Sequence, residues 1–267
     1  MKAKFASTPD LGADDLAASG EPQHAGETLQ RAAVAPQASL EPPMQLFGFP
    51  QRLTAEALGT GLLTAMVVGS GIMADRLSGG NAGVALLAST LAISTGLVAL
   101  IVVFGPISGA HFNPVVTLLF ALRREISTAA AVAYAAAQTV GAVLGVWATH
   151  LMFAQPVWQV STKLRDGAAQ GFSEFVATFG LVAVILGTLR FRPNLTPVAV
   201  GLYIMSACWF TASSCFIDPA ISVARSLSDT FAGIAPSSLP LFIAAQFAGG
   251  LAAIGVFNWL LGEPKPA

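Results

Sequence analysis

Charged side chains and cysteines are both scarce in this chain. Lysine, arginine, aspartate and glutamate make up only 10% of its 267 residues, whereas soluble domains carry about 25%. The two cysteines, Cys208 and Cys215, are too few and too close in sequence for a disulfide framework. The formal net charge of −1 gives no electrostatic reason to bind nucleic acid. These shortages exclude an ordinary soluble domain, a disulfide-stapled scaffold and a basic nucleic-acid-binding protein.

Groups for catalysis or metal binding are missing as well. No cluster of Cys and His has the spacing of metal ligands, and no nucleophile stands beside a base. We therefore expect neither a cofactor nor an enzyme. Apolar residues are abundant instead: they form 54% of the sequence, and the mean hydropathy is +0.69. This composition is typical of an integral membrane protein.

The N-terminal segment differs from the rest of the chain. Residues 1–48 are rich in Ala, Pro, Gln and acidic residues, and they hold no apolar run long enough for a signal peptide. We expect these residues to form a disordered tail on the cytoplasmic side of the membrane. Residues 49–267 are then the membrane domain.

The membrane domain contains six apolar segments long enough to cross a bilayer, which needs about 20 helical residues. Two further apolar segments are too short to span, and each begins with Asn or Asp followed by Pro. Such a pair starts a helix well, because the first residue caps it and proline suits the first turn. We predict an all-α membrane protein with six transmembrane helices and two re-entrant half-helices. The spans lie near Ala55–Met73, Gly83–Phe104, Thr128–Phe153, Phe172–Leu189, Pro197–Thr211 and Leu239–Leu261, and the half-helices cover Pro114–Leu122 and Pro219–Leu227.

The two halves of the membrane domain carry the same landmarks in the same order. The first span contains EALGT and the fourth contains EFVAT, so Glu56 and Glu174 occupy equivalent positions. The third span contains AAQTVG and the sixth contains AAQFAG. Each half has three spans, an odd number, so the two copies enter the membrane with opposite orientations. We expect an inverted repeat, with one copy over residues 52–153 and the other over residues 170–262.

The inverted repeat brings the two half-helices together near the bilayer midplane. Irregular backbone is tolerated at that depth only where it lines a cavity or is buried in protein. Each helix N-terminus carries about half a positive charge, so the pair resists cations and lets neutral molecules pass. Buried carboxylates need partners, and Glu56 and Glu174 are placed to accept hydrogen bonds from the loops before the caps. The alternative is a protonated acid bonded within its own helix bundle.

These motifs resemble those of the aquaporin (major intrinsic protein) family. The resemblance rests on SGAHFNPVVT, on FIDPAISVARSLSDTFAGI, and on the paired E-x-x-x-T and AAQ-x-x-G spans, and it covers residues 55–261. It implies a homotetramer in the lipid bilayer, with one pore per protomer for small neutral solutes. It also implies that Glu56 and Glu174 brace the re-entrant loops. The implied pore motifs are Asn113, Pro114, Val115, Asp218, Pro219 and Ala220, and the implied pore-lining residues are Gly109, Ala110, His111, Phe112, Ser214 and Phe216.

Three elements of the family's selectivity filter are replaced in this sequence. Ile221 stands where the family's second motif has arginine, and Ile93 stands at a position that is usually aromatic. The fifth-span position, a histidine in water channels, falls near Met205 or Ser206. Cys215 resembles the pore-facing cysteine of mercurial-sensitive aquaporins, and inert packing is its alternative. We expect a filter of Ile93, Ser206, Cys215 and Ile221 that is wider, more apolar and poorer in donors.

Such a filter favours neutral solutes that are larger and less polar than water. The string ARSLSDTFAGI resembles a bacterial branch of the family associated with uncharged metalloid solutes, such as arsenous acid and methylated arsenicals. Boric acid, silicic acid, urea and glycerol belong to the same size class. A plain water channel is the first alternative. A proton-coupled secondary transporter, with Asp218 as the proton carrier, is the alternative from another class.

Two charged residues of the second half-helix each allow two interpretations. Asp218 replaces the motif asparagine: ionised, it cancels much of the positive charge of the helix ends, and protonated, it imitates an amide. Arg225 lies seven residues later, and Asp229 follows it at the four-residue spacing of a helix ion pair. Arg225 therefore either pairs with Asp229 or lines the pore.

Lysine and arginine set the predicted orientation, because they are more frequent in cytoplasmic loops. We expect a multi-pass protein of the inner membrane with both termini in the cytoplasm. The cytoplasmic set is then Arg52, Arg123, Arg124, Arg190, Arg192 and Lys265, and the outer set is Arg76, Lys163 and Arg165.

Overall fold

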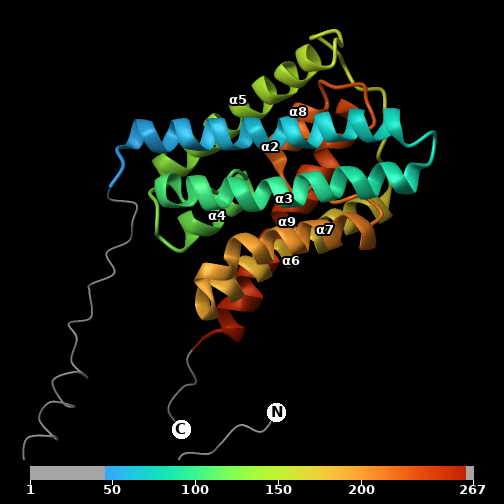
Figure 1. The fold of residues 1–267 in the computed structure, drawn as a ribbon. Coiled ribbons are helices and arrows are strands. Elements are labelled where there is room, and N and C mark those ends of the chain that lie inside the picture. The colour runs from blue at the N-terminus through green and yellow to red at the C-terminus, as the bar shows by residue number, and fades with distance from the viewer. Residues whose placement is uncertain (1–45, 263–267) are drawn as a thin grey trace, which may run out of the picture. The chain divides into compact units, whose positions relative to one another are not determined.

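The structure is a computed structural model, and it describes residues 46–262. Within this range every regular element is a helix (Figure 1). The first of them, α2 (Phe49–Leu77), begins where the predicted tail ends. Nearly all of that tail, residues 1–45, lies outside the described residues. The all-α fold class predicted for the membrane domain is confirmed.

Within residues 46–262 five helices are long and apolar enough to cross a membrane: α2, α3 (Ala82–Ser108), α5 (Thr128–Met152), α6 (Ala168–Phe191) and α9 (Leu239–Leu260), the last preceded by the 3-10 turn η3 (Pro236–Ser238). The predicted fifth span is α7 (Thr196–Phe210), which has only 15 residues. Its length is about 22 Å, and the 3-10 turn η2 (Pro193–Leu195) before it adds about 6 Å. Together they approach the ~30 Å thickness of the hydrocarbon core.

The outer faces of these helices are as apolar as their inner faces. Large aliphatic side chains on α2, α3, α5 and α7 are more than half exposed, among them Leu58, Val102, Val140 and Leu202. A helix at the surface of a soluble protein shows a polar face to water instead. This distribution is the one expected of helices surrounded by lipid.

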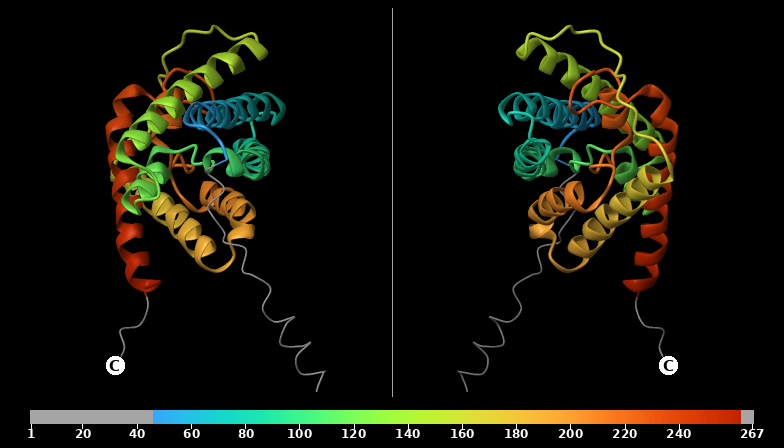
Figure 2. Two further views of the ribbon diagram at one scale, coloured as in Figure 1. Left: turned by 90° about the vertical axis from the view of Figure 1, so that its left-hand side faces the viewer. Right: turned by 90° about the vertical axis from the view of Figure 1, so that its right-hand side faces the viewer.

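The two half-helices are α4 (Pro114–Leu122) and α8 (Pro219–Arg225). Figure 2 shows the loops that lead into them running through the middle of the helix assembly. Asn113 caps α4 by accepting a hydrogen bond from the N–H of Val115 at 2.8 Å. Asp218 caps α8 in the same way. The bounds of α4 are those predicted, whereas α8 ends two residues early.

Contacts between the helices repeat in the two halves. The helix α2 packs against α3 and α5, and α6 packs against α7 and α9. Each half-helix also packs against the last helix of the other half, α4 against α9 and α8 against α5. The pairs α3–α7 and α4–α8 join the halves. This arrangement agrees with the predicted inverted repeat.

Two equivalent glycines set the spacing of the long helices. A Cβ atom at Gly141 of α5 would lie 2.1 Å from the carbonyl oxygen of Ala57 on α2. A Cβ atom at Gly249 of α9 would lie 2.3 Å from the carbonyl oxygen of Phe175 on α6. Only glycine allows backbones to approach this closely in lipid. The close approach lets α5 and α9 place side chains against the glutamates of α2 and α6.

Candidate functional site

Glu56 of α2 is fully buried and binds the loop before α4. Its carboxylate accepts hydrogen bonds from the backbone N–H groups of His111 at 3.0 Å and Phe112 at 2.8 Å. The side-chain amide of Gln138 on α5 donates to the same carboxylate at 2.8 Å and to the hydroxyl of Thr117 at 2.9 Å. The carboxylate thus satisfies N–H groups that would otherwise be unpaired at membrane depth.

Glu174 of α6 makes the equivalent set of bonds in the second half. It accepts from the backbone N–H groups of Phe216 at 2.9 Å and Ile217 at 2.8 Å. The side-chain amide of Gln246 donates to it at 2.7 Å and to the hydroxyl of Ser222 at 3.1 Å. The two glutamines were recognised in the sequence as landmarks only. The signal that could have assigned them to the site is an amide side chain at the same position of both copies, with a buried glutamate in the same half.

The loops before both caps share a left-handed backbone at equivalent positions. In the first loop Ala110 and Phe112 have φ angles of 49° and 51°, and in the second Cys215 and Ile217 have φ angles of 58° and 48°. A residue other than glycine held in this region costs of order 1 kcal/mol or more. Such strain persists only where the surroundings impose it. The hydrogen bonds from the loops to Glu56 and Glu174 hold the backbone in this left-handed conformation.

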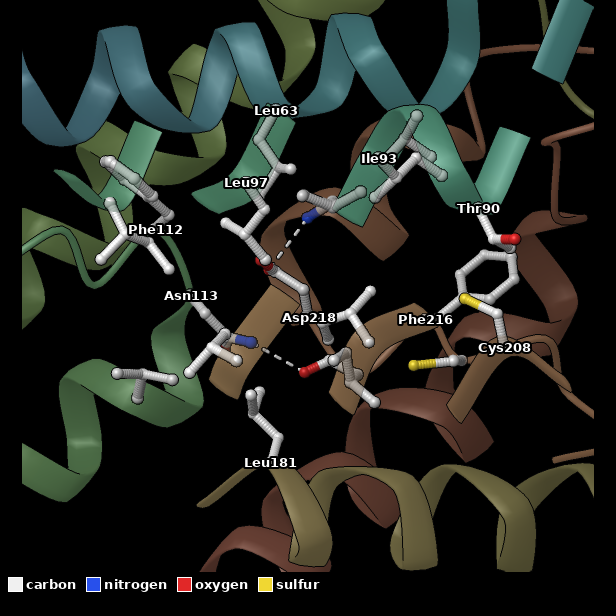
Figure 3. A pocket seen from close by; sticks show the side chains of 18 of the residues that line it. Leu63, Thr90, Ile93, Leu97, Phe112, Asn113, Leu181, Cys208, Phe216 and Asp218 are labelled. Atoms are coloured by element: carbon white, nitrogen blue, oxygen red, sulfur yellow. Dashed lines mark hydrogen bonds between the residues drawn. The ribbon is translucent and has the colours of Figure 1, made fainter. Parts of the chain in front are cut away.

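A cavity of about 200 Å³ is lined by both loops. In Figure 3 Asn113 and Asp218 both appear near the middle of the view, with Phe112 toward one end and Phe216 toward the other, and the amide of Asn113 donates to the carbonyl of Ile217, the residue before Asp218. Aliphatic side chains from the long helices and from α8 supply most of the remaining wall. They include Leu63, Val67, Ile93, Leu97, Leu181, Ile185, Ile204 and Ile221. A mostly apolar wall with a few convergent polar groups is the usual form of a small-molecule site.

Most of the predicted pore residues line this cavity: Ile93, Gly109, Ala110, His111, Phe112, Asn113, Ser214, Cys215, Phe216, Asp218 and Ile221. Four motif residues lie outside its wall and form the first turns of the half-helices, namely Pro114, Val115, Pro219 and Ala220. The motifs thus divide into a part that faces the cavity and a part that builds the helix behind it.

The prediction that Ser206 belongs to the filter is wrong. Ser206 is exposed on the outer side of α7, whereas Ile204 and Cys208 of the same helix line the cavity. Residues four apart share a helix face, and the residue midway between them points away from it. The fifth span therefore contributes a hydroxyl, two aliphatic side chains and a thiol to the wall, from Thr196, Val200, Ile204 and Cys208.

Several cavity residues were absent from the sequence predictions. They include Thr90, Leu97, Leu181, Ile204, Cys208 and Arg165. Helical spacing forward and back from Ile93 would have found Thr90 and Leu97, because they share its face of α3. Arg165 lies in the connection between α5 and α6, and no local pattern in the sequence marks it.

The predicted ion pair between Arg225 and Asp229 is also wrong. The helix α8 ends at Arg225, so the four-residue spacing does not place Asp229 on the same helix face. Asp229 instead accepts hydrogen bonds from the N–H and the hydroxyl of Thr162, at 2.9 and 3.1 Å. Arg225 donates through Nε to the carbonyl of Ala232 and lies in the cavity wall. The structure therefore supports the other interpretation of Arg225, which is lining of the pore.

Comparison with known proteins identifies the family. The family model described as "Major intrinsic protein" matches residues 44–232. The chain belongs to this family. The matched range contains both half-helices, both glutamates and every residue of the cavity wall. Members of the family are passive membrane channels, so the protein is a multi-pass membrane channel and not an enzyme.

Individual relatives agree with this assignment. The chain is 50% identical over 223 residues to the aquaglyceroporin AqpS of Rhizobium meliloti (strain 1021), a match covering 84% of this chain and 95% of the relative. It is 32% identical over 227 residues to the aquaporin NIP1-1 of Oryza sativa subsp. japonica, covering 82% and 77%. The solved structure of the aquaglyceroporin from Plasmodium falciparum superposes with a TM-score of 0.59 at 20% identity, covering 80% of this chain and 98% of that one. That last likeness shows the aquaporin fold.

Proposed function

We propose that this channel passes small uncharged solutes, such as glycerol-like polyols and metalloid acids that include arsenous acid and methylated arsenicals. The observation that carries the proposal is the presence of Ile93 and Ile221 in the cavity wall. An aliphatic side chain at Ile221 offers no hydrogen-bond donor, so it withdraws a contact that small polar molecules such as water use. It leaves apolar surface for larger solutes.

The distribution of polar groups supports the same solute class. Asn113, Asp218 and the two loops supply hydrogen-bonding groups, while the long helices supply aliphatic contacts. A small polyhydroxylated molecule has both kinds of surface and matches both kinds of wall. The aquaglyceroporin of Rhizobium meliloti, at 50% identity over 95% of its length, supports a solute of this class.

The proposal includes an assembly and a location. The protein forms a homotetramer in the inner membrane, with one pore per protomer and both termini in the cytoplasm. The tail is residues 1–48, and the channel domain is residues 49–267. The apolar outer faces of the helices support this assignment, because they need either lipid or a neighbouring protomer. The excess of arginine in the predicted cytoplasmic loops supports the orientation.

Stopped-flow light scattering on proteoliposomes tests the solute class. Water efflux is compared with the uptake of glycerol and of arsenous acid by the same vesicles. We expect fast entry of solute and slower passage of water. Fast water with no entry of solute would identify a plain water channel. Saturating uptake with a steep temperature dependence would identify a secondary transporter that uses Asp218.

A single substitution tests the filter itself. Ile221→Arg restores the arginine that the family has at this position, and we expect it to reduce solute uptake at least tenfold with a smaller effect on water. Ser206→Ala, on the outer face of α7, is the control and leaves both fluxes unchanged. Unchanged solute uptake by a folded Ile221→Arg channel would show that Ile221 does not set selectivity.

A further inference from the structure

Two guanidinium groups share one aromatic ring at the end of the cavity beyond Ile221. Arg225 comes from the end of α8 and Arg165 from the α5–α6 connection, and both line the cavity. The guanidinium carbon of Arg225 lies 3.3 Å from the centre of the Phe216 ring, and that of Arg165 lies 4.9 Å from the same centre. The loop before α8, the helix α8 and the connection between α5 and α6 therefore meet at Phe216.

Backbone carbonyls hold these two side chains in place. Arg165 donates through Nε to the carbonyl of Gly233 at 3.0 Å and through Nη1 to that of Ser213 at 3.4 Å. Arg225 donates through Nε to the carbonyl of Ala232. Carbonyl oxygens orient a guanidinium without neutralising it. Both positive charges therefore persist at this end of the cavity.

Among the described residues no carboxylate forms an ion pair with either guanidinium. Within residues 46–262 the one ion pair joins Arg123 and Glu125, far from this site in the sequence. Glu174, a buried acid of the second half, accepts its hydrogen bonds from the N–H groups of the second loop and from the Gln246 amide. A third cation, Lys163, belongs to the same connection as Arg165. Burial lowers the pKa of Lys163, and the charges of Arg165 and Arg225 lower it further, so the three cations repel one another.

The terminal nitrogens of Arg225 are available to the cavity. Its side chain is only 8% exposed, yet among residues 46–262 no group accepts a hydrogen bond from Nη1 or Nη2, and neither atom is sealed off by protein. A guanidinium out of bulk water has to satisfy these donors. The contents of the cavity, water or a permeating solute, are the acceptors in reach.

The position of Arg225 relative to the replaced filter residue follows from helix geometry. It lies one turn after Ile221 on the same face of α8, about 6 Å farther along the helix axis. We propose that Arg225 and Arg165 together form the cation barrier and the hydrogen-bond donor site of this pore, one helical turn beyond Ile221. This inference rests on the proposed function as a channel for neutral solutes. On this proposal, a pore with a carboxylic acid in its middle excludes cations because of the two guanidinium groups.

The experiment removes both charges and follows ions and solute in the same proteoliposomes. Arg165→Met/Arg225→Met keeps side chains of similar length without charge. Entrapped dyes report K⁺, H⁺ and Cl⁻, and light scattering reports glycerol. We expect K⁺ and H⁺ fluxes to rise at least tenfold with Cl⁻ flux unchanged, and glycerol uptake to fall severalfold because the solute loses these hydrogen-bond donors. No rise in cation flux, or a leak that carries K⁺ and Cl⁻ alike, would overturn the inference.

Three further variants separate charge from structure. Arg165→Lys/Arg225→Lys keeps both charges, and we expect it to exclude cations. Arg76→Met is the matched control, because Arg76 also lies over a phenylalanine ring and donates to a backbone carbonyl but does not line the cavity. The single variant Arg165→Met, outside the half-helix, serves if the double variant does not fold, and a severalfold rise in cation flux is expected of it. A wild-type channel that passes neither glycerol nor another neutral solute contradicts the proposed function rather than this inference.

Discussion

The two halves of the channel hold their loops alike but cap their half-helices differently. In the first half Asn113 accepts a bond from the N–H of Val115 and returns one from its amide to the carbonyl of Ile217, both at 2.8 Å. In the second half Asp218 accepts from the N–H groups of Ala220 and Ile221 at 2.9 and 3.1 Å. A carboxylate has no N–H to return. The fold thus needs an acceptor at both caps and a donor at one.

A second difference concerns the hydrogen-bond partners of Glu56 and Glu174, the two glutamates that hold the loops. The hydroxyl of Ser108 donates to Glu56 at 2.6 Å, which gives the first carboxylate one more partner than Glu174 has among the described residues. The equivalent residue of the second half, Ser213, offers its carbonyl to Arg165. The first half is therefore the more tightly bonded one. The second half carries the acidic cap and Arg225, and the connection that leads into it carries Arg165.

Removal of Glu56 or Glu174 is expected to have the largest effect on stability. Glu56→Ala or Glu174→Ala leaves two loop N–H groups and a glutamine amide unpaired, which costs roughly 3–5 kcal/mol of stability. Glu56→Ala is expected to cost more, because it also frees Ser108. Thermal unfolding in detergent measures both. Glu125→Ala, in a surface ion pair, is the control and changes stability by less than about 1 kcal/mol. If either variant unfolded at the same temperature as the wild type, the hydrogen bonds of that glutamate would not stabilise the fold.

The helix spacing of the two halves is tested by adding one methyl group to each. Gly141→Ala and Gly249→Ala place a Cβ against the backbone of the neighbouring helix, and each is expected to cost about 1–3 kcal/mol. Similar losses in both halves would extend the comparison from the loops to the long helices. Gly255→Ala is the control on α9, because its added methyl group would meet no atom within 4 Å. An effect confined to one half would show that the two packings are not equivalent.

Exchange of the caps sharpens the difference between the halves. Asn113→Asp removes the donor that bonds Ile217 and sets a carboxyl oxygen against that carbonyl, at a cost of about 1–3 kcal/mol. Asp218→Asn keeps the acceptor and is expected to change stability by less than about 1 kcal/mol. Melting temperatures of the two single variants give the comparison directly. A larger drop in melting temperature for Asp218→Asn than for Asn113→Asp would contradict the conclusion that the fold needs a donor at the Asn113 cap.

The charge of Asp218 is expected to have the smallest effect. An ionised Asp218 attracts cations, so in the Arg165→Met/Arg225→Met channel the added change Asp218→Asn should lower K⁺ flux severalfold. Dye-loaded proteoliposomes measure the difference, with glycerol uptake as the check on folding. Identical K⁺ flux with and without the carboxyl group would indicate a protonated Asp218 that imitates the asparagine of the other half.

Local sequence patterns predicted much of this molecule. Apolar runs located the long helices, the Asn-Pro and Asp-Pro pairs located α4 and α8, and repeated landmarks located Glu56 and Glu174. Each of these signals is contained in a short stretch of chain, because helix capping and hydrophobic length act locally. The sequence by itself therefore determined the helices, their order, the repeat and the family.

Tertiary structure alone decided which side chains meet in the cavity. The helix α7 is apolar toward lipid and toward the cavity, so its sequence holds no amphipathic signal to separate Ser206 from Cys208. Arg165 reaches the site through a connection with no regular period, and Arg225 lost its predicted partner because α8 ends early. These contacts depend on how helices are rotated and where loops cross, and both are set by packing between segments far apart in the chain.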